Sequence, residues 1–330
     1  MKSILFVIAI VSIIAIDSCK DSHNPAPIPT YTPIPDNYSS MSDFFNKNAS
    51  PLQTYTVSAA TGGSFTTPQG TTVSVGANSF IDIHSNPITS GNITIEFKDI
   101  YKKSDMLLNN MPTTYYYTGG PMKSGGEFFI RAMQGNKFLR LTGTNPITIK
   151  QPLMGNALDT GMRAMVTVRV GDGWEWGPGL RDTFNHPVDT LSMTLSDYVF
   201  NLYQYSPYSQ PYDTGSWCNS DNSNYFSAYT QTSLTIVAND SVSTYDTYVF
   251  LLFKNLNSMV HVYQGYPNNE LFPYLYAPVG LQCTVVAVGV KNGTVYSSFT
   301  PITISANQTV NFTLMPTTTD AFKTALKALD

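Results

Sequence analysis

The sequence has few charged residues and no stretch of concentrated positive charge. Of its 330 residues only 12% are charged, whereas 13% are aromatic and 21 are tyrosines. Low charge combined with abundant Tyr, Thr, Ser and Asn is typical of an extracellular β-protein and argues against a cytosolic helical enzyme. The formal net charge is −4, and no basic run is present that would grip a phosphate backbone. We therefore expect no nucleic-acid partner.

The motifs of common enzymes and metal sites are also missing. The sequence contains no nucleophile elbow, P-loop or dinucleotide fingerprint. Its four histidines are scattered, and none has the His, Cys or carboxylate neighbours of a metal site. Glu96, Glu127 and Glu175 lie in segments that look ordered, but nothing in the sequence pairs two of them as acid and base. We expect a non-catalytic protein without a cofactor or metal.

No apolar run is long enough to cross a bilayer as a helix. Residues 4–16 are apolar apart from Ser12, and such a run of about 13 residues suits the core of a signal peptide. It ends in Ile16-Asp17-Ser18-Cys19, which resembles the lipobox of bacterial lipoproteins. The resemblance implies that residues 1–18 are a signal peptide and that Cys19 carries a lipid. The alternative is an ordinary secretory signal with a chance cysteine. Lys20-Asp21 resembles the surface-export signal of Bacteroidetes lipoproteins.

Residues 19–50 are predicted to be a tether. Its prolines alternate with small and polar residues and are Pro25, Pro27, Pro29, Pro33 and Pro35. Proline lacks an N–H and fixes φ, so this stretch favours extended polyproline II over a sheet. One short helix is expected over residues 41–48, with Ser42 as its cap.

Residues 51–155 are predicted to form a β-domain. Apolar residues alternate with polar ones, as in strands with one buried face, at Tyr55, Val57, Ala59, Val73, Val75, Ile93, Ile95 and Phe97. Gly125-Gly126 indicates a bulge or a close backbone approach. Gly135-Asn136 predicts a hairpin turn. Tyr115-Tyr116-Tyr117 could be an exposed aromatic strip, although we prefer side chains that alternate and pack.

Four segments of this β-domain resemble one family. They are Gly62-Gly63-Ser64-Phe65, residues 73–80, residues 91–95 and Ser124-Gly125-Gly126-Glu127-Phe128. In their spacing and glycines they resemble the ZU-five domain of ankyrins and netrin receptors, and more closely its version in Bacteroidetes surface lipoproteins. The resemblance implies a β-sandwich that makes protein contacts.

Residues 156–232 are predicted to be a β-rich connecting region with aromatic loops. Trp174 and Trp176 point to the same face of an extended segment. They could form a ligand platform, or they could anchor two β-layers as buried side chains, which we prefer. A tyrosine- and proline-rich loop follows, and its candidate ligand contacts are Tyr205, Tyr208 and Tyr212.

The segment from Gly215 to Asp221 resembles a recurring Gly-Trp-x-Asn-x-Asp turn of the same lipoproteins. We expect Asn219 and Asp221 to bond local backbone there, and oxygen ligation of Ca²⁺ is the alternative. Two cysteines remain besides Cys19. Cys218 and Cys283 could pair as a disulfide in an oxidising compartment, or Cys283 could be a small buried hydrophobe.

Residues 233–330 are predicted to form a C-terminal β-sandwich with a terminal helix. Its turns and short strands suggest an immunoglobulin-like or carboxypeptidase-regulatory-like fold. Asn292-Gly293 is the strongest hairpin signal of the chain, because both residues readily take positive φ. Thr318 or Thr319 is expected to cap the final helix.

These expectations describe an all-β protein with two β-sandwich domains behind a signal peptide and a tether. We expect a lipid-anchored protein of the outer membrane, displayed at the cell surface, that contacts a protein partner or supports envelope structure. The alternative is a glycan-binding lipoprotein beside an outer-membrane nutrient importer, using the two tryptophans and the tyrosine loop. Exposure of Trp174 and Trp176 to solvent separates these two functions.

Overall fold

The chain folds as an all-β protein, as the sequence predicts. The computed structural model describes residues 36–170, 173–178, 189–205, 215–239, 247–265 and 270–330. Among the described residues, strands hold 53% and helices 10%. Pro33–Asp330 form one compact unit. None of the helices in the described residues has the length and apolar character needed to cross a membrane. The predicted signal peptide, Cys19 and most of the tether lie outside the described residues.

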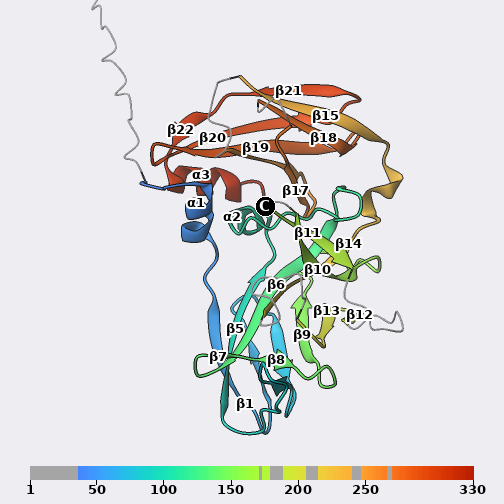
Figure 1. The fold of residues 1–330 in the computed structure, drawn as a ribbon. Helices are drawn as coiled ribbons and strands as arrows, with labels where there is room; N and C mark the ends of the chain where they lie inside the picture. Colours follow the sequence, from blue (N-terminus) through green and yellow to red (C-terminus); the bar gives the residue numbers. More distant parts are fainter. Residues whose placement is uncertain (1–35, 171–172, 179–188, 206–214, 240–246, 266–269) are drawn as a thin grey trace, which may run out of the picture. The chain divides into compact units, whose positions relative to one another are not determined.

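Two sheets build the first sandwich (Figure 1). One sheet runs, in order, β1 (Gln53–Ser58), β5 (Asn92–Ile100), β6 (Lys123–Gln134), β14 (Gly215–Asn222), β10 (Arg163–Val170) and β11 (Gly173–Pro178), with β7 (Lys137–Phe138) paired to β6. The other runs β12 (Thr190–Met193), β13 (Asp197–Leu202), β9 (Ile147–Pro152), β3 (Thr72–Val75) and β2 (Gly63–Thr66). A small sheet pairs β4 (Phe80–Ile81) with β8 (Arg140–Leu141). Strands from residues 163–222 therefore complete sheets that begin in residues 51–155.

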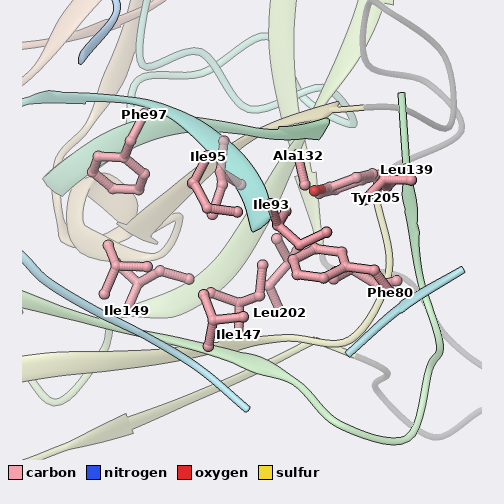
Figure 2. Close-up of a cluster of buried hydrophobic side chains, with 14 of the residues drawn as sticks. Phe80, Ile93, Ile95, Phe97, Ala132, Leu139, Ile147, Ile149, Leu202 and Tyr205 are labelled. Carbon is pink, nitrogen blue, oxygen red and sulfur yellow. The ribbon is translucent and has the colours of Figure 1, made fainter. Parts of the chain in front are cut away.

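The core of the first sandwich follows the alternation read from the sequence. Figure 2 shows Ile93, Ile95 and Phe97 of β5 facing Ile147 and Ile149 of β9. All five side chains are fully buried. Successive strand residues point to opposite faces, so the polar residues between them remain outside this core. Removing a buried phenylalanine ring of this kind costs about 3–5 kcal/mol.

The predicted close approach at Gly126 is present. Gly126 has φ +129°, and a Cβ there would lie 2.4 Å from the ring of Tyr101. The register between β6 and β14 also shifts between Asn219 and Asp221, which marks a β-bulge. Only glycine combines this backbone with this contact. The predicted turn at Gly135-Asn136 joins β6 to β7, with Gln134 opposite Lys137.

A second sandwich follows in residues 231–317. One sheet runs β18 (Leu271–Pro278), β15 (Gln231–Ala238) and β21 (Gln308–Phe312), and β15 pairs with β21 in parallel. The other runs β17 (Met259–Val262), β16 (Thr247–Phe253), β19 (Gln282–Lys291), β20 (Thr294–Thr303) and β22 (Met315–Thr317). Asn292 and Gly293 have φ values of 51° and 79° and form the predicted two-residue turn.

Three helices cover the outer face of the larger of these sheets (Figure 1). They are α1 (Met41–Asn48), α2 (Lys103–Leu108) and α3 (Thr319–Lys327). Phe250 and Leu252 of β16 pack toward the helices, whereas Leu251 and Phe253 pack into the sandwich. A strand buried on both faces reads as a continuous apolar run rather than an alternating one.

The ends of the helices differ in part from expectation. Ser40, not Ser42, caps α1, because its Oγ accepts a hydrogen bond from the N–H of Asp43 at 3.1 Å. Thr318 caps α3 in the same way, since its Oγ1 accepts from the N–H of Ala321 at 3.2 Å. An oxygen two residues into the helix, such as that of Ser42, cannot reach back to these N–H groups.

The first described residues are fixed to the last helix. Asp36 accepts hydrogen bonds through Oδ2 from the backbone N–H and the hydroxyl of Thr319, which begins α3. The Tyr38 hydroxyl lies 3.0 Å from the Thr319 hydroxyl. The Tyr38 N–H also donates to the carbonyl of Gly293 at 3.2 Å, in the hairpin between β19 and β20. The chain thus enters the fold on the second sandwich.

Cys218 and Cys283 do not form the disulfide considered from the sequence. Both are free, buried thiols. Cys218 belongs to the core of the first sandwich and Cys283 to that of the second. Each therefore serves as a small buried hydrophobe.

Candidate ligand pocket and tyrosine surface

The two tryptophans of β11 do not form an exposed platform. Trp176 has no exposed surface, and its Nε1 donates to the carbonyl of Pro112 at 2.7 Å. It packs among buried methionines, namely Met111, Met122 and Met165. Segment 114–116 covers this edge of the sheet, because the Trp176 N–H bonds to Thr114 and its carbonyl to Tyr116. Trp174 remains half-buried. A ligand can therefore reach only one of the pair.

The tyrosine loop does not supply the expected ligand contacts. Tyr205 is 5% exposed and lies in the core of the first sandwich, beside Leu139 (Figure 2). Burial raises the pKa of its phenol well above the ordinary value. Tyr205 is therefore a core residue. Tyr208 and Tyr212 lie outside the described residues.

Trp174 lines a cavity of about 450 Å³, here called the Trp174 pocket. Four elements supply its lining, which comprises Ser42, Phe45, Asn46, Asn109, Asn110, Trp174 and Tyr248. The cavity size lies in the range of small-molecule sites, about 300–1,000 Å³. The three residues from α1 are spaced i, i+3 and i+4, which places them on one helical face. This helical spacing is the one feature of the pocket that the sequence shows. It identifies a pocket wall only when the packing of α1 beside β11 and β16 is known.

Several walls of the Trp174 pocket are held in one orientation. Asn109 follows α2, and its Nδ2 donates to the carbonyl of Asp105 at 2.8 Å. Its Oδ1 accepts from Lys98 Nζ at 2.9 Å. Burial lowers the pKa of Lys98 to about 8. The ring of Tyr248 stacks on His261, with centroids 5.0 Å apart. These contacts preorganise the cavity.

A second candidate site is an exposed group of large side chains, here called the tyrosine surface. It consists of Tyr116, Tyr117, Leu275 and Tyr276, exposed by 43%, 67%, 61% and 40%. Tyr116 and Tyr117 have ring centroids 5.3 Å apart. The two segments meet at Gly119, where a Cβ would lie 3.3 Å from the Tyr276 ring. The exposed strip considered from the sequence is thus present at two of its three tyrosines.

Asn219 and Asp221 do not lie in a turn. They occupy strand β14 and are fully buried, next to the equally buried Glu127 of β6. Asn219 Nδ2 donates to Asp221 Oδ2 at 2.8 Å and lies 3.5 Å from Glu127 Oε1. Their side chains therefore bond to each other and to side chains of β6 rather than to local backbone, because the expected turn is a paired strand.

Burial controls the protonation of this cluster. It raises the pKa of Asp221 well above the ordinary value, although hydrogen bonds from Ser124 and Asn219 oppose the rise. It raises the pKa of Glu127 similarly, and the nearby charge of Asp221 adds to the effect. Burial therefore favours the neutral form of both carboxyl groups. Within the described residues, no three His, Cys, Asp or Glu side chains converge to hold a metal.

No protein-family model matches the sequence, and no curated protein matches it.

Proposed function

We propose that this protein is a non-catalytic binding protein of the cell envelope, which contacts a protein partner through the tyrosine surface. The proposal rests on one observation: four large, mostly aromatic side chains lie exposed on two segments that meet. Apolar patches of this kind mark interaction sites, and tyrosine is enriched in protein interfaces. None of the four residues is charged, so burying them leaves no unpaired charge.

Backbone hydrogen bonds hold the two segments of the tyrosine surface in place. The N–H of Tyr116 donates to the Trp176 carbonyl at 2.9 Å, and the N–H of Gly119 donates to the Tyr115 carbonyl at 2.7 Å. Tyr276 belongs to β18, which pairs with β15. A preformed surface loses little conformational entropy when a partner binds.

The lipid anchor and the location at the cell surface are part of the same proposal. The lipobox-like segment supports a lipid on Cys19, and the surface-export-like Lys20-Asp21 supports display on the outer membrane of a Bacteroidetes-type cell. The resemblance of residues 51–155 to a ZU-five domain supports a role in protein contacts. A lipid-anchored protein with a partner-binding face is an adaptor or a structural element of the envelope.

Site-specific photo-cross-linking in intact cells tests the proposal. A photoreactive amino acid replaces Tyr117 in the full chain, and the matched control carries it at Leu195, which is 97% exposed. We expect one discrete adduct with an envelope protein from position 117 and none from position 195. The adduct should fall at least fivefold when Leu275→Ser is added. Equal adducts from both positions, or an adduct insensitive to Leu275→Ser, would refute the tyrosine surface as the interface.

A further inference from the structure

We infer that the Trp174 pocket is a second, separate binding site, and that it takes a neutral saccharide. The inference does not depend on the proposed protein partner, because none of the tyrosine-surface residues lines this cavity. It rests on the charge, the hydrogen-bonding groups and the aromatic rings of the lining, taken in turn.

The lining carries no formal charge. Its seven residues are one serine, three asparagines and three aromatics. Lys98 contacts this lining through its Nζ, which is already bonded to Asn109. A charged ligand would lose its hydration without gaining a counter-charge, which disfavours it. The pocket therefore fits an uncharged ligand.

The polar groups of the lining suit a ligand rich in hydroxyls. A hydroxyl both donates and accepts, and a carboxamide offers both functions side by side. In the described part of the chain, Ser42 and Asn46 make no side-chain hydrogen bond, and both are exposed. They offer an oxygen and a complete amide from adjacent turns of α1. Asn109 is fixed by its own bonds and adds a polar group to the lining from the segment after α2.

The remaining walls are aromatic. Trp174 and Tyr248 are half-buried, so each ring has accessible surface. Phe45, which also lines the pocket, packs edge-on against Tyr248, with ring centroids 5.1 Å apart. Aromatic rings bury large apolar area with little loss of side-chain freedom. A sugar ring combines apolar C–H faces with peripheral hydroxyls, and therefore matches rings and amides together.

Calorimetric titration of the full-length protein in detergent tests the inference. The probes are neutral tetrasaccharides of glucose (both β-1,4- and α-1,4-linked), mannose, xylose and N-acetylglucosamine, with anionic tetragalacturonate as the charged comparison. We expect saturable binding of at least one neutral probe at one site per chain, and weaker binding of tetragalacturonate. The inference is overturned if none of the neutral probes binds with a Kd below about 10 mM. It is also overturned if the protein binds the anionic probe more tightly than every neutral probe.

Variants then locate the site. Trp174→Ala and Asn46→Ala should each weaken binding at least tenfold, and Trp174→Phe, which keeps a ring, should weaken it less than Trp174→Ala. Asn46 is exposed on α1, so we expect Asn46→Ala to keep the fold. The test therefore stands even if Trp174→Ala fails to fold. Leu195→Ala, at an exposed position outside both sites, should leave the Kd unchanged. Binding unaffected by both pocket variants would place the saccharide elsewhere and overturn the inference. Failure of the cross-linking at Tyr117 would leave these titrations unchanged.

Discussion

We expect Asp189 to lower the stability of this protein as pH rises, and we expect its replacement by asparagine to remove that cost. Asp189 is 2% exposed. Its Oδ1 accepts the N–H of Tyr203 at 3.0 Å, whereas its Oδ2 is buried without a hydrogen-bond partner. Burial, only partly opposed by such backbone hydrogen bonds, raises its pKa from 3.8 to about 7.

The sign and size of the effect follow from proton linkage. Between the two pKa values the unfolded chain has lost the proton that the folded chain keeps, so stability falls as pH rises from 3.8 to about 7. At about 1.4 kcal/mol per pKa unit, the full loss is about 4 kcal/mol, and it is complete above pH 7. Below pH 3.8 both states are protonated and the loss is absent.

Asp189→Asn removes the charge and keeps the oxygen that accepts from Tyr203. It also places an N–H₂ where Oδ2 lacks a partner, and an unpaired buried donor costs about 1–3 kcal/mol at every pH. We therefore expect the variant to match the wild type within about 1 kcal/mol near pH 5, and to exceed it by about 1–3 kcal/mol at pH 8.5.

Guanidinium denaturation at both pH values measures this difference. The matched control is Asp320→Asn, an exposed position on α3, for which the difference from wild type should stay constant. The reasoning is refuted if the advantage of Asp189→Asn fails to grow by about 2 kcal/mol or more between pH 5 and pH 8.5.

Three further outcomes are expected. Gly126→Ala should lower stability by about 3 kcal/mol or more, because the new Cβ meets the Tyr101 ring at a strained φ; an unchanged melting temperature would contradict the bulge. Glu127→Gln should raise the melting temperature at pH 8, and less so at pH 5, because burial raises the pKa of Glu127; a gain that is equal at both pH values counts against a buried neutral carboxyl. Reductant should shift the melting temperature by less than about 2 °C, since Cys218 and Cys283 are free thiols, and a larger fall would indicate a disulfide.

Local signals predicted much of the fold. The period-two alternation at residues 93–97 placed the right side chains in the core, since strand geometry alone decides which face they take. The hairpin at Asn292-Gly293 followed from the φ values that those residue types tolerate. Both signals lie within a few residues, so no knowledge of tertiary contacts was needed.

Elements stabilised by distant contacts were missed. Helix α2 has no side-chain cap. It is held by Asp330, whose carboxylate accepts from the N–H and hydroxyl of Ser104, and by Lys103 Nζ, which donates to the Phe253 carbonyl at 2.7 Å. Strand β18 contains Pro273, which argues against a strand in sequence, but β18 lies at a sheet edge where proline is tolerated.

The candidate site was only partly within reach of the sequence. The two-residue period of a strand placed Trp174 and Trp176 on one face. It could not show that Trp176 is buried among methionines while Trp174 lines a cavity. The partners of Trp174 in the pocket come from residues 42–46, 109–110 and 248. Their meeting depends on how α1 and α2 pack against β16, and no local pattern encodes it.

The bonds of Asp36 and Tyr38 to Thr319 and Gly293 have a mechanical consequence. If the chain is tethered to a membrane through Cys19, tension along the tether enters the fold at these bonds. It is then resisted by the second sandwich, because Tyr38 is held beside the hairpin between β19 and β20. Strand β1 of the first sandwich comes later in the chain and is shielded by this attachment and by the buried face of α1. In such an anchored protein, a pulling force on the lipid would load the second sandwich and leave the first sandwich unstrained.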